Sequence, residues 1–354
     1  MYTLKELLRR AVDIGAADIF IIAGVPISYK AGQHLERLDS ERVMPAISEQ
    51  LIREIYQLAN RDIERLMTTG DDDFSFTVPE LSRFRVSTYR QRGSLAAVIR
   101  VISFGIPDYK QRNIPEEVMK VADRTKGLVL VTGLAGSGKS TTLACIIDRI
   151  NNTRENHIIT LEEPIEFLHR NNKSIISQRE IGLDSENYIT SLRACLRQAP
   201  DVILVGEMRD YETIATAMTA AETGHLVLST LHTVGAANTI DRIIDVFPPA
   251  QQQQVRVQIS MILQSVVSQQ LIPTENGELI PAFEIMHLNS AIRNMIRDSK
   301  IHQIDSVIAT SAADGMITMD GSLTELVKSG RISKQTAIRY ASNPDILSKK
   351  LAAF

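Results

Sequence analysis

Residues 127–150 read GLVLVTGLAGSGKSTTLACIIDRI, and this stretch decides the fold of the larger part of the chain. An apolar run leads into a glycine-rich turn, which is followed by a lysine, small hydroxyl residues and the apolar spacing of a helix. The turn has the spacing Gly133-x4-Gly138-Lys139-Ser140, which is the pattern of a phosphate-binding loop. The strand before it and a helix expected over residues 141–150 are the context that this pattern requires, and they argue against a plain glycine turn with an exposed lysine.

The residue types of this loop indicate what it binds. Glycines let the backbone curl so that successive N–H groups point at phosphate oxygens, and the start of the helix adds its positive end. Lys139 can neutralise the β- and γ-phosphates, and the Ser140 hydroxyl can ligate Mg²⁺. Because Asn172-Lys173 continues into Ser-Ile, the guanine-reading motif is absent and an adenine nucleotide is favoured. We therefore predict ATP and Mg²⁺ as cofactors, held by Gly133, Leu134, Ala135, Gly136, Ser137, Gly138, Lys139, Ser140 and Thr141.

Composition places the chain among soluble globular proteins. Its 354 residues are 44% hydrophobic and 23% charged with a net charge of -3, so two or three domains are expected and nothing draws the whole chain to nucleic acid. Cys145 and Cys195 are far apart in the sequence, which favours two reduced thiols over a zinc module. Charges interrupt the N-terminus and no apolar run reaches about 18 residues, so we expect a cytoplasmic protein without a signal peptide or a transmembrane segment.

The pattern of apolar residues divides the chain into regions of different character. Residues 1–105 show short strands, a helix expected over 48–67 and a hairpin that turns at Arg92-Gly93, which indicates a small α+β domain. Continuous apolar runs then follow between residues 127 and 232, and such runs are typical of parallel strands that helices cover on both faces. Only helices are predicted from residue 284 onward. The expected boundaries are 1–105 for the first domain, 106–115 for a linker, 116–283 for the α/β domain and 284–354 for a helical region.

Polar side chains follow three of the predicted parallel strands. The run DVILVGE ends in Glu207, where a carboxylate can hold Mg²⁺ or polarise water, and HLVLSTLHT brings His232, with His225 at its start. The run HIITLEEPIEF brings Glu162, Glu163 and, beyond a proline, Glu166. Taken singly, each is more often a solvated turn residue or an ordinary histidine. Because ligands gather outside the carboxyl ends of parallel strands, their joint occurrence after a phosphate loop predicts a nucleotide site with catalytic groups.

Four segments taken together resemble a known family. GLAGSGKSTT, LEEPIEF, LVGEMRD and TAAETGHLVLSTLHT are similar, in order and spacing, to the four signature boxes of secretion ATPases, the hexameric motors of type II and IV secretion and of type IV pili. AIRNMIRDSK, TIDRIIDVFP and the absence of a four-cysteine zinc module resemble the PilT-like pilus retraction ATPases in particular. The resemblance implies an α/β fold with a RecA-like P-loop ATPase domain, a small N-terminal α+β domain that is PAS-like, and a helical C-terminal region.

The resemblance also implies a role for each polar residue. Glu166 would be the general base that activates water, Glu207 would hold Mg²⁺ together with Ser140, and His232 would sense the γ-phosphate. Arginines of the N-terminal hairpin would reach a nucleotide held by a neighbouring subunit, because phosphoryl transfer needs a cation near the γ-phosphate. A solvated hairpin face is the alternative. The residues implied in catalysis are Glu166, Glu207, His232, Arg85, Arg92 and Arg100, and Glu163 and His225 are placed with the nucleotide-binding residues.

The function implied by this resemblance is that of a ring-forming ATP hydrolase that powers the retraction of type IV pili in twitching motility. It would be a homo-hexamer on the inner face of the cytoplasmic membrane, where it drives a platform protein of the pilus machine. Two alternatives remain, a related motor for pilus extension, secretion or DNA uptake, and a nucleotide-dependent regulatory module that does not hydrolyse ATP. The missing zinc cysteines disfavour the first alternative, and the two catalytic carboxylates disfavour the second.

Overall fold

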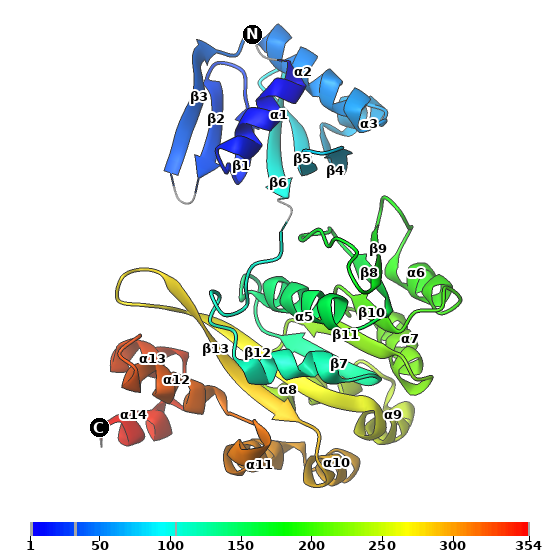
Figure 1. The fold of residues 1–354 in the computed structure, drawn as a ribbon, viewed down its shortest axis with the longest axis vertical. Helices are drawn as coiled ribbons and strands as arrows, with labels where there is room; N and C mark the ends of the chain where they lie inside the picture. The colour runs from blue at the N-terminus through cyan, green and yellow to red at the C-terminus, as the bar shows by residue number, and fades with distance from the viewer. Residues whose placement is uncertain (1–2, 32–33, 103–104, 353–354) are drawn as a thin grey trace. The chain divides into compact units, whose positions relative to one another are not determined.

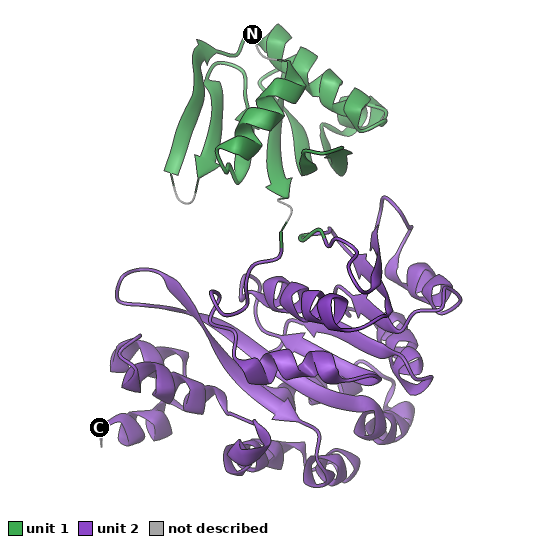
Figure 2. Cartoon of the chain, in the orientation of Figure 1, with its two compact units in different colours: residues 1–105, 166–168 green, residues 106–165, 169–354 purple. Residues whose placement is uncertain are grey.

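The computed structural model describes residues 3–31, 34–102 and 105–352. The chain divides into two compact units (Figure 2): unit 1 comprises residues 1–105 and 166–168, and unit 2 comprises residues 106–165 and 169–354. Each unit contains its own β-sheet and its own buried apolar clusters. The separate cores explain why the apolar pattern of the sequence changes character after residue 105.

Unit 1 is a six-stranded antiparallel sheet with helices on one face (Figure 1). Its elements are α1 (Leu4–Asp13), β1 (Asp18–Ile21), β2 (Pro26–Ala31), β3 (His34–Arg42), α2 (Pro45–Leu58), α3 (Glu64–Thr69), β4 (Asp71–Val78), β5 (Ser82–Gln91) and β6 (Ser94–Ile102). The strands lie in the order β3-β2-β1-β6-β5-β4. Helix α1 buries Leu4, Leu7, Leu8 and Ala11, the stripe that its sequence spacing predicts.

The hairpin predicted in unit 1 is confirmed, whereas the single helix predicted over residues 48–67 is wrong. Strands β5 and β6 pair along their length, and Arg92 and Gly93 in the turn have φ angles of 48° and 78°, as a two-residue hairpin turn requires. The region expected to be one helix forms α2 and α3 instead. Asn60, just after α2, adopts a φ of 50°, and this left-handed conformation interrupts the helical path.

Unit 2 is built on a seven-stranded sheet that is parallel apart from a hairpin at one edge. The strands are β7 (Gly127–Thr132), β8 (His157–Glu162), β9 (Ile175–Glu180), β10 (Val202–Val205), β11 (Leu226–Leu231), β12 (Leu263–Pro273) and β13 (Leu279–His287), in the spatial order β13-β12-β7-β11-β10-β8-β9. Both faces are buried, because Leu128 and Leu130 of β7 enter one apolar cluster while Val129 and Val131 enter another. The predicted parallel sheet under helices is confirmed, and its carboxyl ends lie along one edge.

Helices cover both faces of this sheet, and a further group follows β13 (Figure 1). They are α4 (Glu116–Met119), η1 (Lys120–Asp123), α5 (Lys139–Thr153), α6 (Tyr188–Cys195), α7 (Tyr211–Glu222), α8 (Ala236–Asp245), α9 (Pro249–Ile262), α10 (Ser290–Arg297), η2 (Ile301–Gln303), α11 (Ile304–Thr310), η3 (Ala312–Asp314), α12 (Met319–Lys328), α13 (Lys334–Tyr340) and α14 (Pro344–Ala352). Helices α12 to α14 pack against the β12–β13 hairpin, where Met319 and Leu323 join Ile272 and Ile280. Within residues 3–31, 34–102 and 105–352, no helix combines the length and apolar character needed to cross a membrane.

Several elements of unit 2 differ from the sequence-based expectation. The sequence predicts neither β9 nor the β12–β13 hairpin, and in β12 the reason is that serine and glutamine occupy buried positions among the apolar ones. Strand β13 runs to His287 and so crosses the boundary expected at residue 284, after which only helices were predicted. The helix after the phosphate loop begins at Lys139, earlier than the predicted start at residue 141.

Candidate functional site

The phosphate loop connects β7 to α5 in unit 2. It begins at Gly133 and ends at Gly138, which is the N-cap of α5 and has a φ of 90°. Gly133 and Gly136 also have positive φ angles, of 142° and 76°, a region that residues with a Cβ rarely adopt. The glycine spacing of the motif is therefore required by the backbone path. The path ends at the first turn of α5, whose N–H groups have no partners within the helix and are suited to phosphate oxygens.

Lys139 is the first residue of α5, and its side chain turns back over the loop. The residue is only 8% exposed. Its Nζ donates to the carbonyl oxygen of Gly133 at 2.8 Å and to that of Leu134 at 2.9 Å. Ser140 and Thr141 follow in the same turn, and Ser140 is exposed. The ammonium group and the hydroxyl group of the motif thus lie together where the helix begins.

Gln269 on β12, which no sequence motif points to, supports the loop from the neighbouring strand. The residue is 3% exposed, and its Oε1 accepts a hydrogen bond from Thr142 Oγ1 at 2.7 Å. A Cβ on Gly138 would lie 2.8 Å from Gln269 Nε2, and a Cβ on Gly133 would lie 2.2 Å from the Gln269 carbonyl oxygen. The loop backbone therefore packs directly against β12, which excludes a side chain at Gly133 and would force Gln269 to shift for a side chain at Gly138.

Gly138→Ala should weaken ADP binding by at least about tenfold. The methyl group would meet Gln269, and alanine at a positive φ costs roughly 1–2 kcal/mol, where about 1.4 kcal/mol is a factor of ten. Gly136→Ala is the matched control, because its φ is also positive but no described atom lies within 4 Å of a Cβ there. Calorimetric titration of ADP into both variants measures the difference. Equal affinities would show that the contact with Gln269 does not restrict the loop.

Glu207 and His232 meet at the carboxyl edge of the sheet. The pairing of β11 with this segment continues beyond the end of β10, where Met208 N donates to Thr230 O at 3.2 Å. His232 Nε2 lies 3.3 Å from Glu207 Oε2, and Arg209 forms an ion pair with the other carboxylate oxygen. The Glu207 side chain is 12% exposed, whereas the His232 side chain is 51% exposed. The structure therefore brings Glu207 and His232 together and adds Arg209 as a second partner of the carboxylate.

The same edge of the sheet carries the phosphate loop. Strand β11 lies between β7 and β10, and Thr132 at the end of β7 is opposite Leu231 at the end of β11. Gly133 N donates to Leu231 O at 3.3 Å, so the loop starts beside the residue that precedes His232. The phosphate loop, His232 and Glu207 thus follow the carboxyl ends of three adjacent strands, which is where parallel sheets bind their ligands.

Two further carboxylates lie on the other side of β10, where Glu162 is the last residue of β8 and Glu163 follows it. Glu162 is half-buried and accepts a hydrogen bond from Thr160 Oγ1 at 2.6 Å, while Glu163 is exposed. Burial raises the pKa of Tyr188 at the start of α6, and the charges of Glu163, Glu207 and Glu162 raise it further. A Cβ on Gly206 would lie 3.0 Å from Tyr188 Oη and 3.4 Å from Glu162 Cα. Tyr188 and the end of β8 therefore lie close to the residue that precedes Glu207.

His225 lies at the opposite end of β11 from His232. Its Nδ1 is 2.9 Å from Ala220 O and 3.1 Å from Thr223 Oγ1, before the strand begins at Leu226. The six residues of β11 separate the two histidines, which corresponds to about 20 Å. The structure does not bring His225 to the phosphate loop of its own unit, because His225 precedes the strand whereas His232 follows it.

The other residues predicted for catalysis lie in unit 1 or in the segment grouped with it. Glu166 is exposed in the loop after β8, and residues 166–168 group with unit 1. Arg85 and Arg100 are opposite each other on β5 and β6, and Arg100 Nε lies 2.9 Å from Asp18 Oδ1. Arg92 lies in the hairpin turn, about 20 Å along the strand from Arg85. Unit 1 thus presents Arg85 and Arg100 as a pair, with Arg92 apart, and the roles of all four residues stay predictions.

Known proteins are similar to this chain over most of its length. The family described as type II/IV secretion system protein matches residues 1–328. The type IV pilus retraction ATPase PilT of Pseudomonas aeruginosa is 44% identical over 346 residues, which cover 97% of this chain and 99% of that protein. A twitching motility protein of Neisseria gonorrhoeae is 49% identical over 277 residues, which cover 78% of this chain and 74% of that protein.

A solved structure has the same fold. The crystal structure of the pilus retraction motor PilT with bound ADP is similar with a TM-score of 0.90 and 42% sequence identity, over 99% of this chain and 100% of that one. The expected fold, a RecA-like ATPase domain with a small N-terminal domain and a helical C-terminal part, is confirmed. On sequence and structure alike, this chain belongs to the type II/IV secretion system protein family of ATPases.

Proposed function

We propose that this chain is a motor ATPase that powers the retraction of type IV pili. It is an ATPase by family and by fold. The observation that carries the proposal is the placement of the phosphate loop, Glu207 and His232 at one edge of unit 2, in a chain that is similar over 97% of its length to a pilus retraction ATPase.

In this proposal the phosphate loop holds ATP, and Ser140 and Glu207 hold Mg²⁺ beside it. A serine hydroxyl and a carboxylate are oxygen ligands of the kind that Mg²⁺ takes, usually with phosphate oxygens and water as the remaining ligands. This fits the part of the chain that the structure describes, where no group of three or more His, Cys, Asp or Glu residues could hold a metal ion by itself. Bound Mg²⁺ would neutralise charge on the phosphates during transfer.

Glu166 takes the proton from the attacking water, and His232 contacts the γ-phosphate. The half-exposed ring of His232 supports this role, because it can meet a ligand while Glu207 orients it. Arg85 and Arg100 bring positive charge to the nucleotide of a neighbouring subunit, and their exposed positions on adjacent strands support a shared task. Arg92 and His225 have less support, since Arg92 is remote from this pair and His225 from the loop.

The working form in this proposal is a homo-hexamer at the inner face of the cytoplasmic membrane, where closure of successive sites displaces a platform protein of the pilus machine. Coupling of hydrolysis to contact between subunits follows if an arginine of one subunit completes the site of the next. The similarity to a protein described as a pilus retraction motor supports retraction, rather than extension, as the process that this chain drives.

Deletion of the gene in its host should give cells that carry more surface pili than wild-type cells and do not twitch, because pilus extension would continue without retraction. Electron microscopy of surface pili and a twitching assay measure both effects. The wild-type gene should restore twitching, whereas a gene encoding Glu166→Gln should not. Loss of surface pili on deletion would identify an extension motor, and unchanged pili with impaired secretion would identify a secretion motor.

A further inference from the structure

Glu284 lies on β13, and its carboxylate contacts the first residue of two helices. The residue is 5% exposed. One carboxylate oxygen accepts a hydrogen bond from Ala236 N at 2.7 Å, and the other accepts one from Met319 N at 3.3 Å. Ala236 begins α8 and Met319 begins α12, so one side chain caps helices from two different parts of unit 2. Burial raises the pKa of Glu284, and the two N–H groups act in the opposite direction.

Helix α8 follows directly after the loop that carries His232. This loop runs from His232 to Gly235, whose φ is 89°, and Gly235 contacts residues of β12 and β13. Gly235 N donates to Ser268 Oγ at 3.0 Å, and a Cβ on Gly235 would lie 3.7 Å from Glu284 Oε1. Ser268 and Glu284 are opposite each other in the β12–β13 pair. The position of the His232 loop therefore depends on a polar pair inside the edge hairpin.

The other helix begins the C-terminal region, and the neighbours of Glu284 on β13 bind the same segment. Phe283 N donates to Ser322 Oγ at 3.2 Å. Ile285 and Ile317 exchange two backbone hydrogen bonds, at 2.9 Å and 3.1 Å. Three consecutive residues of β13 thus hold the start of α12, and among them Glu284 alone also contacts α8 through a hydrogen bond that the structure describes.

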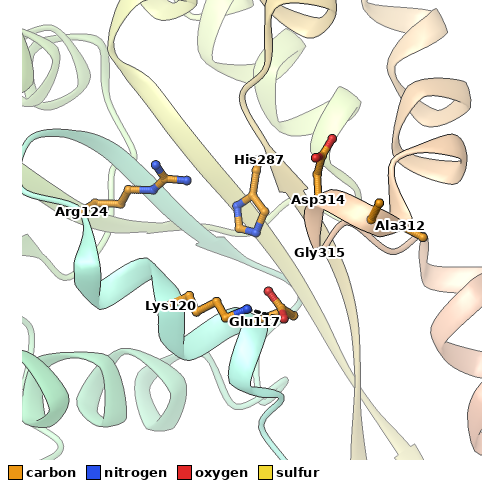
Figure 3. Close-up of a pocket in the computed structure, with 8 residues that line it drawn as sticks. Glu117, Lys120, Arg124, His287, Ala312, Asp314 and Gly315 are labelled. Carbon is orange, nitrogen blue, oxygen red and sulfur yellow. Dashed lines mark hydrogen bonds and ion pairs between the residues drawn. The ribbon is translucent and has the colours of Figure 1, made fainter.

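A pocket of about 300 Å³ lies where the segment before α12 meets β13 (Figure 3). His287 of β13, Glu117 and Lys120 of the α4–η1 segment, and residues 312–315 line it. Gly315 has a φ of 79°, and a Cβ there would lie 2.5 Å from Glu117 Oε2, so the turn packs closely on α4. Lys120 Nζ is 2.7 Å from Glu117 Oε1. The segment that leads into α12 is therefore seated on both α4 and β13.

We propose that Glu284 is a positioning residue for ATP hydrolysis, and that it makes the placement of His232 depend on the seating of α12 against β13. This inference rests on the proposed role of His232 at the γ-phosphate. A purely structural cap would affect stability and leave the turnover of folded molecules unchanged. A positioning residue affects turnover and leaves ADP binding unchanged, because ADP lacks the γ-phosphate and Gln269, not Glu284, supports the phosphate loop.

Glu284→Ala in the full-length protein should lower kcat at least about tenfold, because misplacement of a group by about 1 Å can cost about 10²-fold. The Kd for ADP should stay within about twofold of the wild-type value, because the contacts of Glu284 are with the starts of α8 and α12 and not with the phosphate loop. Glu284→Gln keeps the shape of the side chain and one acceptor oxygen, so its kcat should lie between those of the wild type and Glu284→Ala. For each variant, kcat and the Kd for ADP are measured at a temperature at which a thermal unfolding curve shows that the variant is folded.

Ser322→Ala is the matched control for these variants. It removes the bond from Phe283 N but keeps both contacts of Glu284 and the two backbone bonds between Ile285 and Ile317. The start of α12 therefore stays in place, and kcat should stay within about twofold of wild type. Wild-type kcat in folded Glu284→Ala would overturn the proposal. A loss of ADP binding in parallel with kcat would also overturn it, because the effect would then lie at the phosphate loop.

Met319→Pro tests the same link from the C-terminal side. Proline removes the N–H group that Glu284 binds but is tolerated at the first position of a helix, and Thr318 already has the extended ψ of 157° that suits a residue before proline. Met319→Ala is the reference, because it loses the same buried side chain and keeps the N–H group. The kcat of Met319→Pro should be at least about threefold below that of Met319→Ala. Equal values would contradict the link.

His232→Ala separates this inference from the proposed function. Hydrolysis that is lost in His232→Ala but normal in the folded Glu284 variants overturns the inference alone. Wild-type hydrolysis in His232→Ala overturns the role of His232 at the γ-phosphate, and with it the inference. Lost hydrolysis in His232→Ala together with the graded loss in Glu284→Gln and Glu284→Ala is the result we expect.

Discussion

Glu166→Gln should reduce kcat for ATP hydrolysis by about 10²- to 10⁴-fold, the usual contribution of a positioned general base. Glutamine has nearly the shape of glutamate but does not take up a proton, so water would no longer be activated while the nucleotide still binds. A steady-state ATPase assay gives kcat, and a titration with ADP gives Kd. We expect the Kd for ADP to stay within about twofold of the wild-type value, because a group that acts only in the transition state does not contribute to product binding.

Glu163→Gln is the matched control for this experiment. Both glutamates are exposed in the loop after β8, so the two variants remove similar charges from the same segment. Glu163→Gln should keep a kcat close to that of the wild type, because a group that only binds the nucleotide affects KM and not kcat. The opposite pattern, with hydrolysis lost in Glu163→Gln and kept in Glu166→Gln, would assign the base to Glu163, whose charge acts on Tyr188 together with that of Glu207.

Lys139→Ala should raise the Kd for ADP by about 30- to 4,000-fold, which corresponds to the 2–5 kcal/mol that truncation of a buried charge partner costs. Lys139 is 8% exposed, so its ammonium group would meet a bound phosphate in a region that is poorly screened by water. Its present hydrogen bonds to Gly133 and Leu134 keep it at the loop, and a phosphate would compete with these carbonyl groups for it. Calorimetric titration with ADP measures the loss.

Lys126→Ala serves as the control for Lys139→Ala, since Lys126 is an exposed lysine just before β7. Its removal should change the Kd for ADP by less than about twofold, as expected for a surface substitution. A circular dichroism spectrum and a thermal unfolding curve establish that both variants are folded. Wild-type affinity in folded Lys139→Ala would contradict the assignment of the phosphate loop.

The strands of unit 2 are predictable from the sequence wherever their burial shows in local composition. Strands β7, β8, β10 and β11 are continuous apolar runs, because each is covered on both faces. Strand β12 lacks this signal, since buried positions hold Ser268 and Gln269. Their polar groups are satisfied by Gly235 and Thr142, which are distant in the sequence, so the pairing cannot be inferred from local pattern. The break between α2 and α3 does have a local signal, because Asn60 adopts a left-handed conformation at little cost.

The site shows the same division between local and distant information. Motif spacing identifies the residues that we propose to face the nucleotide, such as Lys139, Glu207 and His232. It does not identify those that hold them, because Gln269 beneath the loop and Glu284 beside the start of α8 act through contacts made only in the folded chain. The sequence also groups His225 and His232, which belong to the same signature segment, with the nucleotide site. In the folded chain, however, the whole of β11 separates the two histidines.

We propose that the phosphate loop, Glu207 and His232 form one nucleotide site. The most direct test is a crystal structure of the chain with Mg²⁺ and a non-hydrolysable ATP analogue. We predict that Lys139 Nζ contacts the β- and γ-phosphates, that Mg²⁺ lies between the phosphates and the oxygens of Ser140 and Glu207, and that His232 is within hydrogen-bond distance of the γ-phosphate. A bound triphosphate that neither Glu207 nor His232 reaches, directly or through one water molecule, would contradict it.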